Sequence, residues 1–416
     1  MCHQSPIILL PEKISVLRDE KNQIIRTDNE EFNIYYKNIL YPYSDEYDVI
    51  IDCPWGKNLG DRWRLDEFND DMVSAEFKIY VYNSVGKLLS SAGCTIEVFE
   101  KERKERFNLL CIGDSMTMAE TYIRHAAEKV RNVNTLGTRS ICGVRHEGRG
   151  GWTCSAYFER YEDQEWGVSP FLFPVGYGAE EYYGSTDFYK RLIDPEYSSS
   201  YSYTGFEYNS IEYGMLAFNN GRLCRFTEKG YEPVNDFKGF EFSFSKYMKR
   251  NGFEKPDAVS LLFGANEFQL CGYDGFEKTV EEYINCISRI IESVKEYDSG
   301  IRVIVCMPIC GGGGYAWGSK MGCMGSAKQY DNCIKMANSK LLKSFDARRE
   351  EGIYICPMLA VCDTFNGFPK EYVRANIYSE NAVLCSSDWV HPSDAGYMQM
   401  GDALAGVIAS IRQSGR

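Results

Sequence analysis

The sequence predicts an α/β protein whose parallel sheet is preceded by a smaller all-β region. From residue 107 onward, near-continuous apolar runs alternate with helical patterns, which is typical of parallel strands covered on both faces. Residues 1–104 instead hold β-branched and aromatic runs separated by turn residues. A length of 416 residues also favours two domains over one core.

The first 104 residues are expected to form a small β-sandwich of roughly six to eight strands. The NSVGK stretch (83–87) predicts a hairpin turn, and the alternating charges of KERKER (101–106) indicate a solvated linker. The strand-like runs are FNIYYKNIL (32–40), YDVIID (47–52), AEFKIYVYNSVGKLLSSAG (75–93) and CTIEVFE (94–100).

The second region, residues 107–416, is expected to contain the parallel sheet. An aromatic-rich insertion at about 165–240 lacks a clear helical or strand period. A stretch of this length is more often functional or packed on itself than flexible. Two interpretations are therefore possible, a binding surface or a separate small core of aromatic side chains. The predicted strands are 107–112, 257–264, 301–308 and 352–358, and the clearest predicted helices are 276–298, 326–350 and 393–412.

Composition excludes several classes of partner. The net charge of −13, from 59 acidic and 46 basic residues, argues against nucleic acid and anionic membranes. No apolar run approaches the roughly 18 residues of a membrane span, and the N-terminus does not resemble a signal peptide. A cytoplasmic location is therefore expected. The sixteen cysteines, among them Cys111, Cys306 and Cys356 in predicted strands, are expected to pack as reduced thiols without a metal.

The stretch LLCIGDSMTMAE (109–120) predicts a buried strand that turns directly into a helix. Ser115 lies in that turn, at the carboxyl end of the strand, where open α/β sheets bind ligands. A hydroxyl there has two interpretations. Ser115 or Thr117 is the cap of the helix, or Ser115 takes part in chemistry.

Three later stretches favour the chemical interpretation. His391, one of four histidines, follows Asp388 by three residues, so that the carboxylate can orient the imidazole. Asn266 follows the predicted strand 257–264, and Gly150 and Gly151 lie in a loop that leads into a helix. A side-chain amide and an unobstructed backbone N–H are the donors that a developing oxyanion needs.

In this order, GDSMT, GRGGWT, GANE and DWVHPS resemble the four blocks of the SGNH (GDSL-type) hydrolase superfamily. The resemblance implies a flavodoxin-like three-layer α/β/α fold, no cofactor and no metal. It implies Ser115 as nucleophile, His391 as general base and Asp388 as its orienting acid. The implied oxyanion donors are Ser115, Gly151 (with Gly150 as the other register) and Asn266. Glu267 stands where the family usually has Asp, which leaves the support of that loop open.

The substrate is a further expectation from the same resemblance. A β-sandwich ahead of such a domain is similar to some microbial carbohydrate O-acetylesterases, and sugar rings stack on aromatic faces, with Trp152 and Trp317 as candidates. The expected partner is an acetylated oligosaccharide, and the loop GGGGYAWGSKMG (311–322) is expected to cap a small acyl site. A lipid or acyl-thioester hydrolase and a non-catalytic carbohydrate-binding protein remain alternatives. The oligomeric state stays open.

Overall fold

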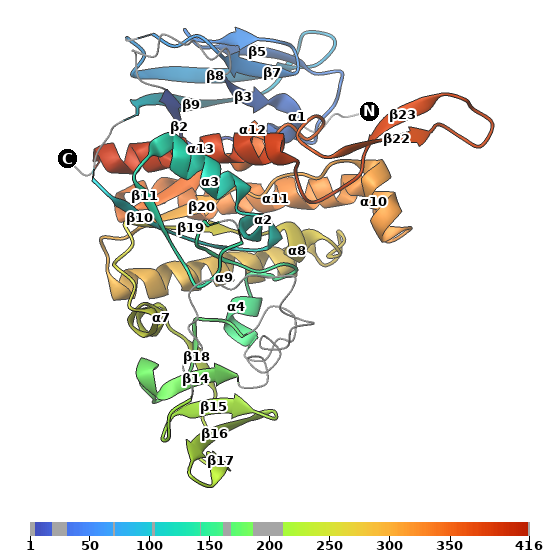
Figure 1. Ribbon diagram of the computed structural model, residues 1–416. Helices are drawn as coiled ribbons and strands as arrows, with labels where there is room; N and C mark the ends of the chain where they lie inside the picture. The colour runs from blue at the N-terminus through green and yellow to red at the C-terminus, as the bar shows by residue number, and fades with distance from the viewer. Residues whose placement is uncertain are drawn as a thin grey trace.

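A parallel sheet of six strands lies at the centre of the computed structural model, which describes residues 5–18, 31–69, 71–101, 105–141, 143–160, 168–185 and 211–414 (Figure 1). The strand order is β11-β10-β19-β20-β21, and the short β12 pairs with the end of β10. These strands are β10 (Phe107–Gly113), β11 (Val133–Leu136), β12 (Glu147–Gly148), β19 (Ala258–Leu262), β20 (Arg302–Cys306) and β21 (Ile353–Cys356). The predicted parallel sheet is confirmed.

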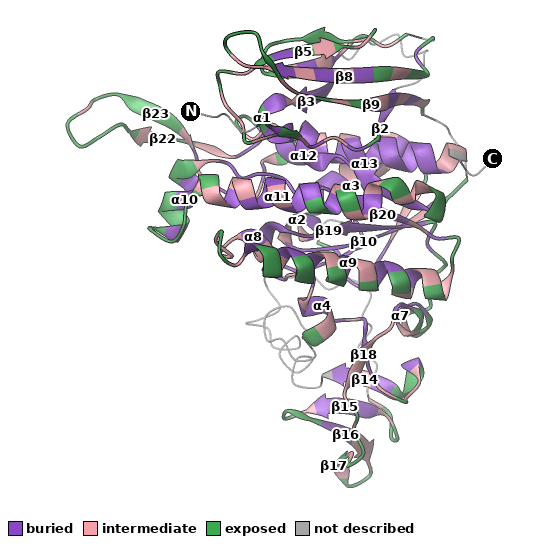
Figure 2. Cartoon of the chain, turned by 180° about the vertical axis from the view of Figure 1, so that it is seen from behind, coloured by how far each residue is buried: buried purple, intermediate pink, exposed green. Residues whose placement is uncertain are grey.

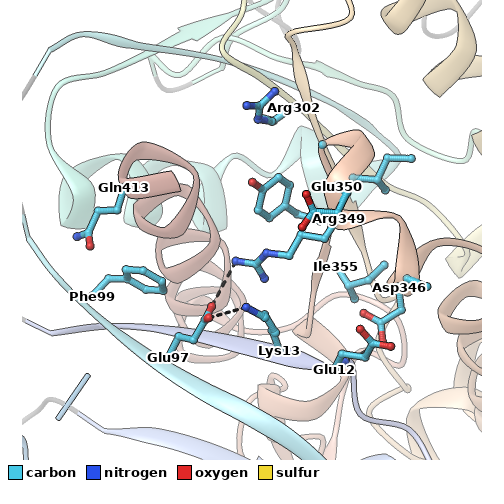
Figure 3. Close-up of a pocket in the computed structure, with 14 residues that line it drawn as sticks. Glu12, Lys13, Glu97, Phe99, Arg302, Asp346, Arg349, Glu350, Ile355 and Gln413 are labelled. Carbon is cyan, nitrogen blue, oxygen red and sulfur yellow. Dashed lines mark hydrogen bonds and ion pairs between the residues drawn. The ribbon is translucent and has the colours of Figure 1, made fainter. Parts of the chain in front are cut away.

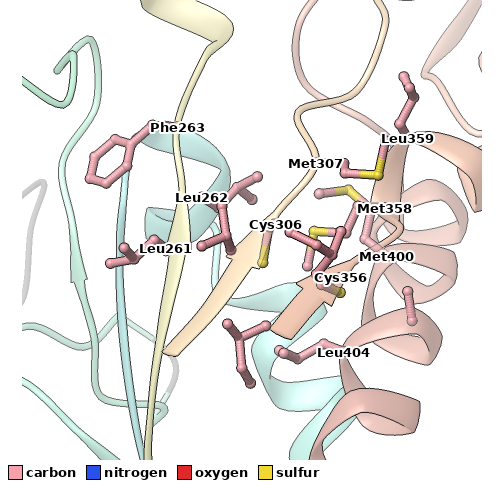
Figure 4. Close-up of a cluster of buried hydrophobic side chains, with 14 of the residues drawn as sticks. Leu261, Leu262, Phe263, Cys306, Met307, Cys356, Met358, Leu359, Met400 and Leu404 are labelled. Carbon is pink, nitrogen blue, oxygen red and sulfur yellow. The ribbon is translucent and has the colours of Figure 1, made fainter. Parts of the chain in front are cut away.

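The central strands read as unbroken apolar runs because helices cover both faces of the sheet. Cys306 and Cys356 lie beside Met400 and Leu404 of the last helix, and all four side chains are fully buried (Figure 4). Cys111, in β10, is equally buried. All fourteen cysteines in the described part of the chain are free thiols, and most of them are buried.

Helices lie on both sides of this sheet (Figures 1 and 2). On one side α3 (Thr121–Val130) contacts α13 (Asp394–Ser414), and His125 of α3 bonds to Asp402 of α13 at 2.7 Å. On the other side α9 (Phe276–Tyr297) contacts α7 (Phe244–Asn251) and α11 (Ala327–Phe345). The shorter helices are α1 (Tyr36–Ile39), α2 (Ser115–Met118), α4 (Ala156–Glu159), α8 (Ala265–Phe268), α10 (Gly314–Met321), α12 (Met358–Val361), η1 (Ala179–Glu181) and η2 (Asp346–Glu351).

The N-terminal region consists of a four-stranded sheet, β2-β9-β8-β5, a three-stranded sheet, β3-β7-β6, and the pair β1-β4. Trp63 and Phe77 join the two larger sheets through an edge-to-face contact with ring centroids 5.2 Å apart. The predicted turn at 83–87 is confirmed by the bond from Asn83 N–H to the Lys87 carbonyl at 3.0 Å. The strands are β1 (Ile7–Ile8), β2 (Lys13–Arg18), β3 (Phe32–Tyr35), β4 (Leu40–Tyr41), β5 (Asp48–Asp52), β6 (Lys57–Asn58), β7 (Arg62–Leu65), β8 (Ser74–Tyr82) and β9 (Leu88–Glu100).

The aromatic-rich insertion contains regular structure where it is described, although its sequence lacks a clear helical or strand period. β13 (Leu172–Pro174) pairs with β18 (Phe240–Phe242). A four-stranded sheet follows the order β14 (Tyr182–Ser185), β15 (Leu216–Asn219), β16 (Arg222–Thr227) and β17 (Gly230–Pro233). Residues 161–167 and 186–210 of the insertion lie outside the described residues.

Helix α13 lies between the central sheet and the N-terminal region (Figure 1). Gly406 allows close packing against β2, because a Cβ there would lie 1.9 Å from the Ser15 carbonyl oxygen. Nearby, the buried Asn38 donates through Nδ2 to the carbonyls of Leu359 and Cys362 at 2.8 and 2.7 Å. The N-terminal sheets are therefore packed onto the larger region and are not a loosely tethered module.

A hairpin of β22 (Lys370–Arg374) and β23 (Ala382–Ser386) projects from the body of the molecule, as both overall views show. In the part of the chain that the structure describes, no helix is both long and apolar enough to cross a membrane.

Candidate active site

The turn after β10 presents Ser115 at the carboxyl edge of the sheet. Gly113 ends the strand, and a Cβ there would lie only 2.4 Å from the Leu262 carbonyl oxygen of the neighbouring strand. The Asp114 carboxylate then caps α2 by accepting the Met116 N–H at 2.9 Å. The cap is thus neither Ser115 nor Thr117. The Thr117 hydroxyl bonds instead to the hydroxyl of Tyr122, at 3.0 Å.

Ser115, His391 and Asp388 lie in one line of hydrogen bonds. Ser115 Oγ is 2.9 Å from His391 Nε2, and His391 Nδ1 is 3.2 Å from Asp388 Oδ2. The other oxygen of Asp388 accepts the backbone N–H groups of Val390 and His391 at 2.9 and 3.0 Å. The loop before α13 therefore holds the carboxylate in place while its second oxygen faces the imidazole.

The pKa values of two carboxyl groups near Ser115, those of Asp388 and Asp114, are shifted in opposite directions. Burial would raise the pKa of Asp388, but the hydrogen bonds from the His391 side chain and from the two backbone N–H groups lower it to about 2. Burial raises the pKa of Asp114 to about 7, despite the bond from Met116. Asp388 is therefore the carboxylate that stays ionised beside His391 at neutral pH.

The loop after β12 carries the two glycines of the expected oxyanion site. Gly151 has a φ of +71° and is exposed, and a Cβ there would meet no atom within 4 Å. Gly150 is buried. Arg149 N–H, just before them, bonds to the Gly113 carbonyl at 3.0 Å and ties this loop to the Ser115 turn. The geometry favours Gly151 over Gly150 as a residue that a ligand can approach.

A buried ion pair, between Arg149 and Glu147, lies within the segment that leads to Gly151. Arg149 Nη1 lies 3.0 Å from Glu147 Oε2, and the two residues are 4% and 0% exposed. The second oxygen of Glu147 accepts the Tyr247 hydroxyl at 2.8 Å and the Thr138 N–H at 2.6 Å. This network was not predictable from the sequence, because nothing in HEGRGG (146–151) distinguishes a buried Glu from a solvated one.

A second buried pair lies on the other side of the same loop. Gly148 N–H donates to His146 Nδ1 at 2.8 Å, so that Nε2 of His146 carries the hydrogen that faces Glu120 Oε1 at 3.2 Å. Glu120 itself has a φ of +62° and is fully buried. His146 therefore serves the architecture of the loop and is not part of the Ser115 hydrogen-bond line.

The loop after β19 joins the same edge through Asn266 and Glu267. Asn266 Nδ2 donates to the Trp152 carbonyl at 2.9 Å, which leaves its second N–H for another acceptor. Glu267 accepts the Cys154 N–H at 2.6 Å and the Gly264 N–H at 2.9 Å. Burial raises its pKa to about 7, and these backbone bonds oppose that shift. The Glu at this position therefore keeps the loop supported.

The two tryptophans proposed as sugar contacts do not present open ring faces. Trp152 is 0% exposed and packs between the guanidinium groups of Arg149 and Arg160, 5.0 and 5.4 Å from its ring. Stacking of a sugar on Trp152 is excluded by that burial. Trp317 is 3% exposed and donates its Nε1–H to the Met324 carbonyl at 3.0 Å.

Trp317 instead lines a pocket of about 230 Å³ together with Tyr330. The rings of Trp317 and Tyr330 contact Trp389, at centroid distances of 4.8 and 5.2 Å. Trp389 follows Asp388 directly, and Phe268, also in the lining, is two residues after Asn266. The other lining residues are Gln269, Leu270, Gly272, Met324, Gly325, Ser326 and Gln329.

Among the described residues, no group of three or more His, Cys, Asp or Glu side chains is arranged to hold a metal ion. The hydrogen-bond line of Ser115, His391 and Asp388 indicates what the arrangement can do chemically. A hydroxyl bonded to an imidazole that is oriented by an ionised carboxylate is the arrangement of an activated oxygen nucleophile.

Comparison with known proteins gives one family match. Residues 238–404 match the family described as GDSL-like lipase/acylhydrolase. This segment contains Asn266, Asp388 and His391 and does not reach Ser115. A search of curated proteins found no match.

Solved structures with a similar fold include three that illustrate the range. A carbohydrate esterase family 3 protein from Talaromyces cellulolyticus is 12% identical, with a TM-score of 0.37, covering 74% of this chain and 99% of its own. A carbohydrate acetylesterase family member from Sinorhizobium meliloti is 11% identical, with a TM-score of 0.36, covering 73% of this chain and 98% of its own. A possible lipase from Chitinophaga pinensis is 12% identical, with a TM-score of 0.35, covering 74% of this chain and 99% of its own.

Proposed function

We propose that this chain is a serine esterase whose nucleophile is Ser115, in keeping with the match of residues 238–404 to the GDSL-like lipase/acylhydrolase family. The observation that carries this proposal is the 2.9 Å contact between Ser115 Oγ and His391 Nε2, together with the Asp388 carboxylate on the far side of the imidazole. Asp388 fixes the tautomer in which Nδ1 carries the hydrogen, so that Nε2 is the acceptor that faces Ser115.

In the proposed mechanism His391 accepts the Ser115 proton while Oγ attacks the ester carbonyl. The tetrahedral intermediate collapses as His391 returns that proton to the leaving alcohol, and an acyl group remains on Ser115. Water, deprotonated by His391, then attacks the acyl-serine, and as the second tetrahedral intermediate collapses His391 gives that proton to Ser115 Oγ, which leaves as the carboxylic acid is released. Throughout, the ionised Asp388 stabilises the imidazolium.

The oxyanion that forms in both steps is proposed to bind three donors. These are the N–H groups of Ser115 and Gly151 and the second Nδ2 hydrogen of Asn266. Support comes from the bond between Asn266 and the Trp152 carbonyl, which links the Asn266 amide to the loop of Gly151. The open space at Gly151 also leaves room for a substrate.

For the substrate we propose an O-acetylated carbohydrate. The acidic, polar chain suits a polyhydroxylated substrate better than a lipid surface, and the β-rich N-terminal region is similar to the arrangement in carbohydrate O-acetylesterases. A sugar contact by Trp152 is no longer part of this proposal.

A second candidate is hydrolysis of longer acyl esters or thioesters. The observation that favours it is the pocket beside Trp389, because Phe268, Leu270, Trp317 and Met324 give it a largely apolar wall. A volume of about 230 Å³ exceeds what an acetyl group fills. If that pocket takes the acyl group, chains longer than acetate should be preferred.

The test compares acyl length and alcohol in one assay. Purified protein is given acetylated manno-, xylo- and cello-oligosaccharides and 4-nitrophenyl esters from acetate to dodecanoate, and the released acid is measured. An acetylesterase should release acetate from an oligosaccharide and slow steeply beyond butyrate, because overfilling a closed pocket costs about 1–3 kcal/mol. Faster turnover of octanoate than of acetate would favour the second candidate. No hydrolysis of any ester would contradict both.

A further inference from the structure

A second pocket, of about 620 Å³, lies where the N-terminal region meets the larger one (Figure 3). One wall comes from β2 and β9, with Lys13, Glu97 and Phe99. The other wall comes from the start of β20, from η2 and β21, and from the end of α13, with Arg302, Asp346, Arg349 and Gln413. Its size is within the range of small-molecule sites in proteins.

This junction pocket is remote from Ser115. Arg302 is the first residue of β20, and Gly352, also in the lining, directly precedes β21. Both belong to the amino edge of the parallel sheet, whereas Ser115 follows the carboxyl end of β10. A five-residue strand at about 3.3 Å per residue separates the two edges by at least about 15 Å. The lining of this pocket includes none of Ser115, His391 and Asp388.

The walls are fixed by polar contacts that cross the junction. Glu97 accepts Lys13 Nζ at 2.8 Å and Arg349 Nη2 at 3.3 Å, as Figure 3 shows. Arg349 also donates to Ser410 Oγ of α13, at 2.6 Å. Asp346 accepts the backbone N–H of Glu12 at 2.8 Å. Side chains from both regions are therefore held in place around the cavity before any ligand arrives.

Several recognition groups in the lining are only partly used. Arg302 donates one N–H to the Gly300 carbonyl at 2.8 Å, and within the described residues no carboxylate pairs with it. Phe99 adds an aromatic side chain, and Gln413 adds an amide that both donates and accepts. Donors, acceptors and an apolar ring thus face one cavity.

The charges of the lining define the chemistry of a ligand. The lining carries four carboxylates, which would repel an anionic ligand, and three cationic side chains, which would repel a cationic ligand. A neutral ligand avoids both penalties, and hydroxyl groups can donate to the carboxylates while they accept from the guanidinium. The charged lining residues are Glu12, Glu97, Asp346 and Glu350 and, of opposite sign, Lys13, Arg302 and Arg349.

We propose that the junction pocket is a second, non-catalytic site that binds a neutral oligosaccharide, with a sugar ring against Phe99 and hydroxyl groups on Arg302 and Asp346. The proposal does not depend on the esterase activity, because the ligand needs no acyl group. Since its walls belong to both regions, a bound glycan would also hold the two regions together.

The test measures binding of unacetylated sugars to the full chain by calorimetry. Cello-, xylo- and manno-hexaose are titrated into the wild type, Phe99→Ala, Arg302→Gln and the control Ile50→Ala, whose side chain is exposed on β5. At least one sugar should bind the wild type and the control with equal affinity. The affinity of the same sugar for each of the two pocket variants should be lower by a factor of about ten or more. Hydrolysis of 4-nitrophenyl acetate should be unchanged in all four, which also reports folding.

Three outcomes would overturn the proposal. No hexaose binds the wild type at millimolar concentration, or a hexaose binds all four proteins equally. Alternatively, oligogalacturonate or inorganic phosphate binds in preference to the neutral sugars and is lost in Arg302→Gln, which would make this an anion site. Ser115→Ala separates the two proposals, because it should abolish hydrolysis and leave this binding intact.

Discussion

At the scale of single residues, the hydroxyl of Ser115 and the carboxylate of Asp114 have separate tasks. Asp114 accepts the Met116 N–H and so caps α2. Ser115 Oγ faces His391 at 2.9 Å and takes no part in the cap. A residue that supplies the cap next to the proposed nucleophile lets the nucleophile be replaced without loss of the helix start.

Ser115→Ala is therefore expected to lose activity and keep its fold. Removal of a nucleophile of this type costs a factor of about 10⁴ to 10⁶ in kcat. The measurement is turnover of 4-nitrophenyl acetate together with the thermal midpoint, and Ser91→Ala, at an exposed position on β9, is the control. Retention of more than a tenth of wild-type turnover would contradict the role of Ser115.

Asp388→Asn tests the orienting acid. With a pKa of about 2, Asp388 is ionised throughout the range of an esterase assay and adds no inflection of its own to the pH profile of the rate. The amide has no charge to stabilise the imidazolium that forms in the proposed reaction, so it should lower kcat for 4-nitrophenyl acetate by about 10⁴. An unchanged kcat would make Asp388 a structural residue of the loop.

The positions of Ser115, Asp388 and His391 were predictable because each lies in a short local pattern. Burial was not predictable in the same way. Trp152 looked available for a ligand, but Arg149 and Arg160 cover its ring from positions that only the folded chain brings together. Local spacing therefore predicted which side chains lie together better than it predicted their exposure.

At the scale of elements, the conformation of the loop after β12 depends on an ion pair that is buried away from water. Glu147 and Arg149 are almost fully buried, and their ion pair sits under the backbone that leads to Gly151. A buried pair is costly to break, because the remaining charge has no solvent. The proposed oxyanion donor is therefore held by residues that never touch the substrate.

Glu147→Gln should destabilise the fold by about 3–5 kcal/mol and lower kcat more than it raises KM. Denaturant unfolding and steady-state kinetics measure the two effects. The double variant Glu147→Gln/Arg149→Met should recover part of the stability, since it removes the orphaned charge. Glu76→Gln, which breaks the exposed pair with Lys78, is the control and should change little. If Glu147→Gln and Glu76→Gln change the free energy of unfolding and kcat by the same amounts, the buried ion pair has no special role.

The Ser115 turn should also make stability depend on pH. The pKa of Asp114 is about 7 in the folded chain and 3.8 as its ordinary value, so the folded state binds more protons between these limits. Stability should therefore fall as the pH rises from about 4 to about 7 and level off above that. Asp114→Asn keeps the capping oxygen, and its thermal midpoint should fall less over this range. Equal slopes for the variant and the wild type would argue against the raised pKa.

Elements with strong apolar runs were predicted within a few residues, as for the helix at 276–298, which is observed as α9 (Phe276–Tyr297). Short or polar elements were not. β12 has only two residues, and its strand character comes from its pairing with Ile112 and Gly113. FNIYYKNIL was expected as one strand, but a helical turn at Tyr36–Ile39 interrupts it, and Asn38 in that turn bonds to α12. Tertiary contacts decided these cases.

At the scale of the whole molecule, the two regions share a core. α13 contacts α3 and β21 of the larger region and β2 and β9 of the N-terminal one. Arg349 and Asn38 add polar contacts across the same boundary. These contacts join the buried side chains of both regions into one core, so the free energy of unfolding should belong to both together.

Calorimetry should therefore show a single unfolding transition, and Asn38→Ala should lower its midpoint without splitting it. That variant leaves the buried carbonyls of Leu359 and Cys362 without the Asn38 donor, at a cost of about 1–3 kcal/mol for each unsatisfied group. Val85→Ala, in an exposed turn, is the control. Two separate transitions in either protein would show that the regions unfold independently.

The place of α13 also has a consequence for synthesis of the chain on the ribosome. The sheet of β2 and β9 is complete once residue 100 has emerged, but the helix that covers it begins only at Asp394. For nearly three hundred residues of translation, Leu17, which lines a small cavity with Ala409 and Arg412 of α13, has no permanent cover on that face. The first part of the chain to be made is thus among the last to be covered, and we expect the nascent protein to need chaperones or rapid synthesis during that interval.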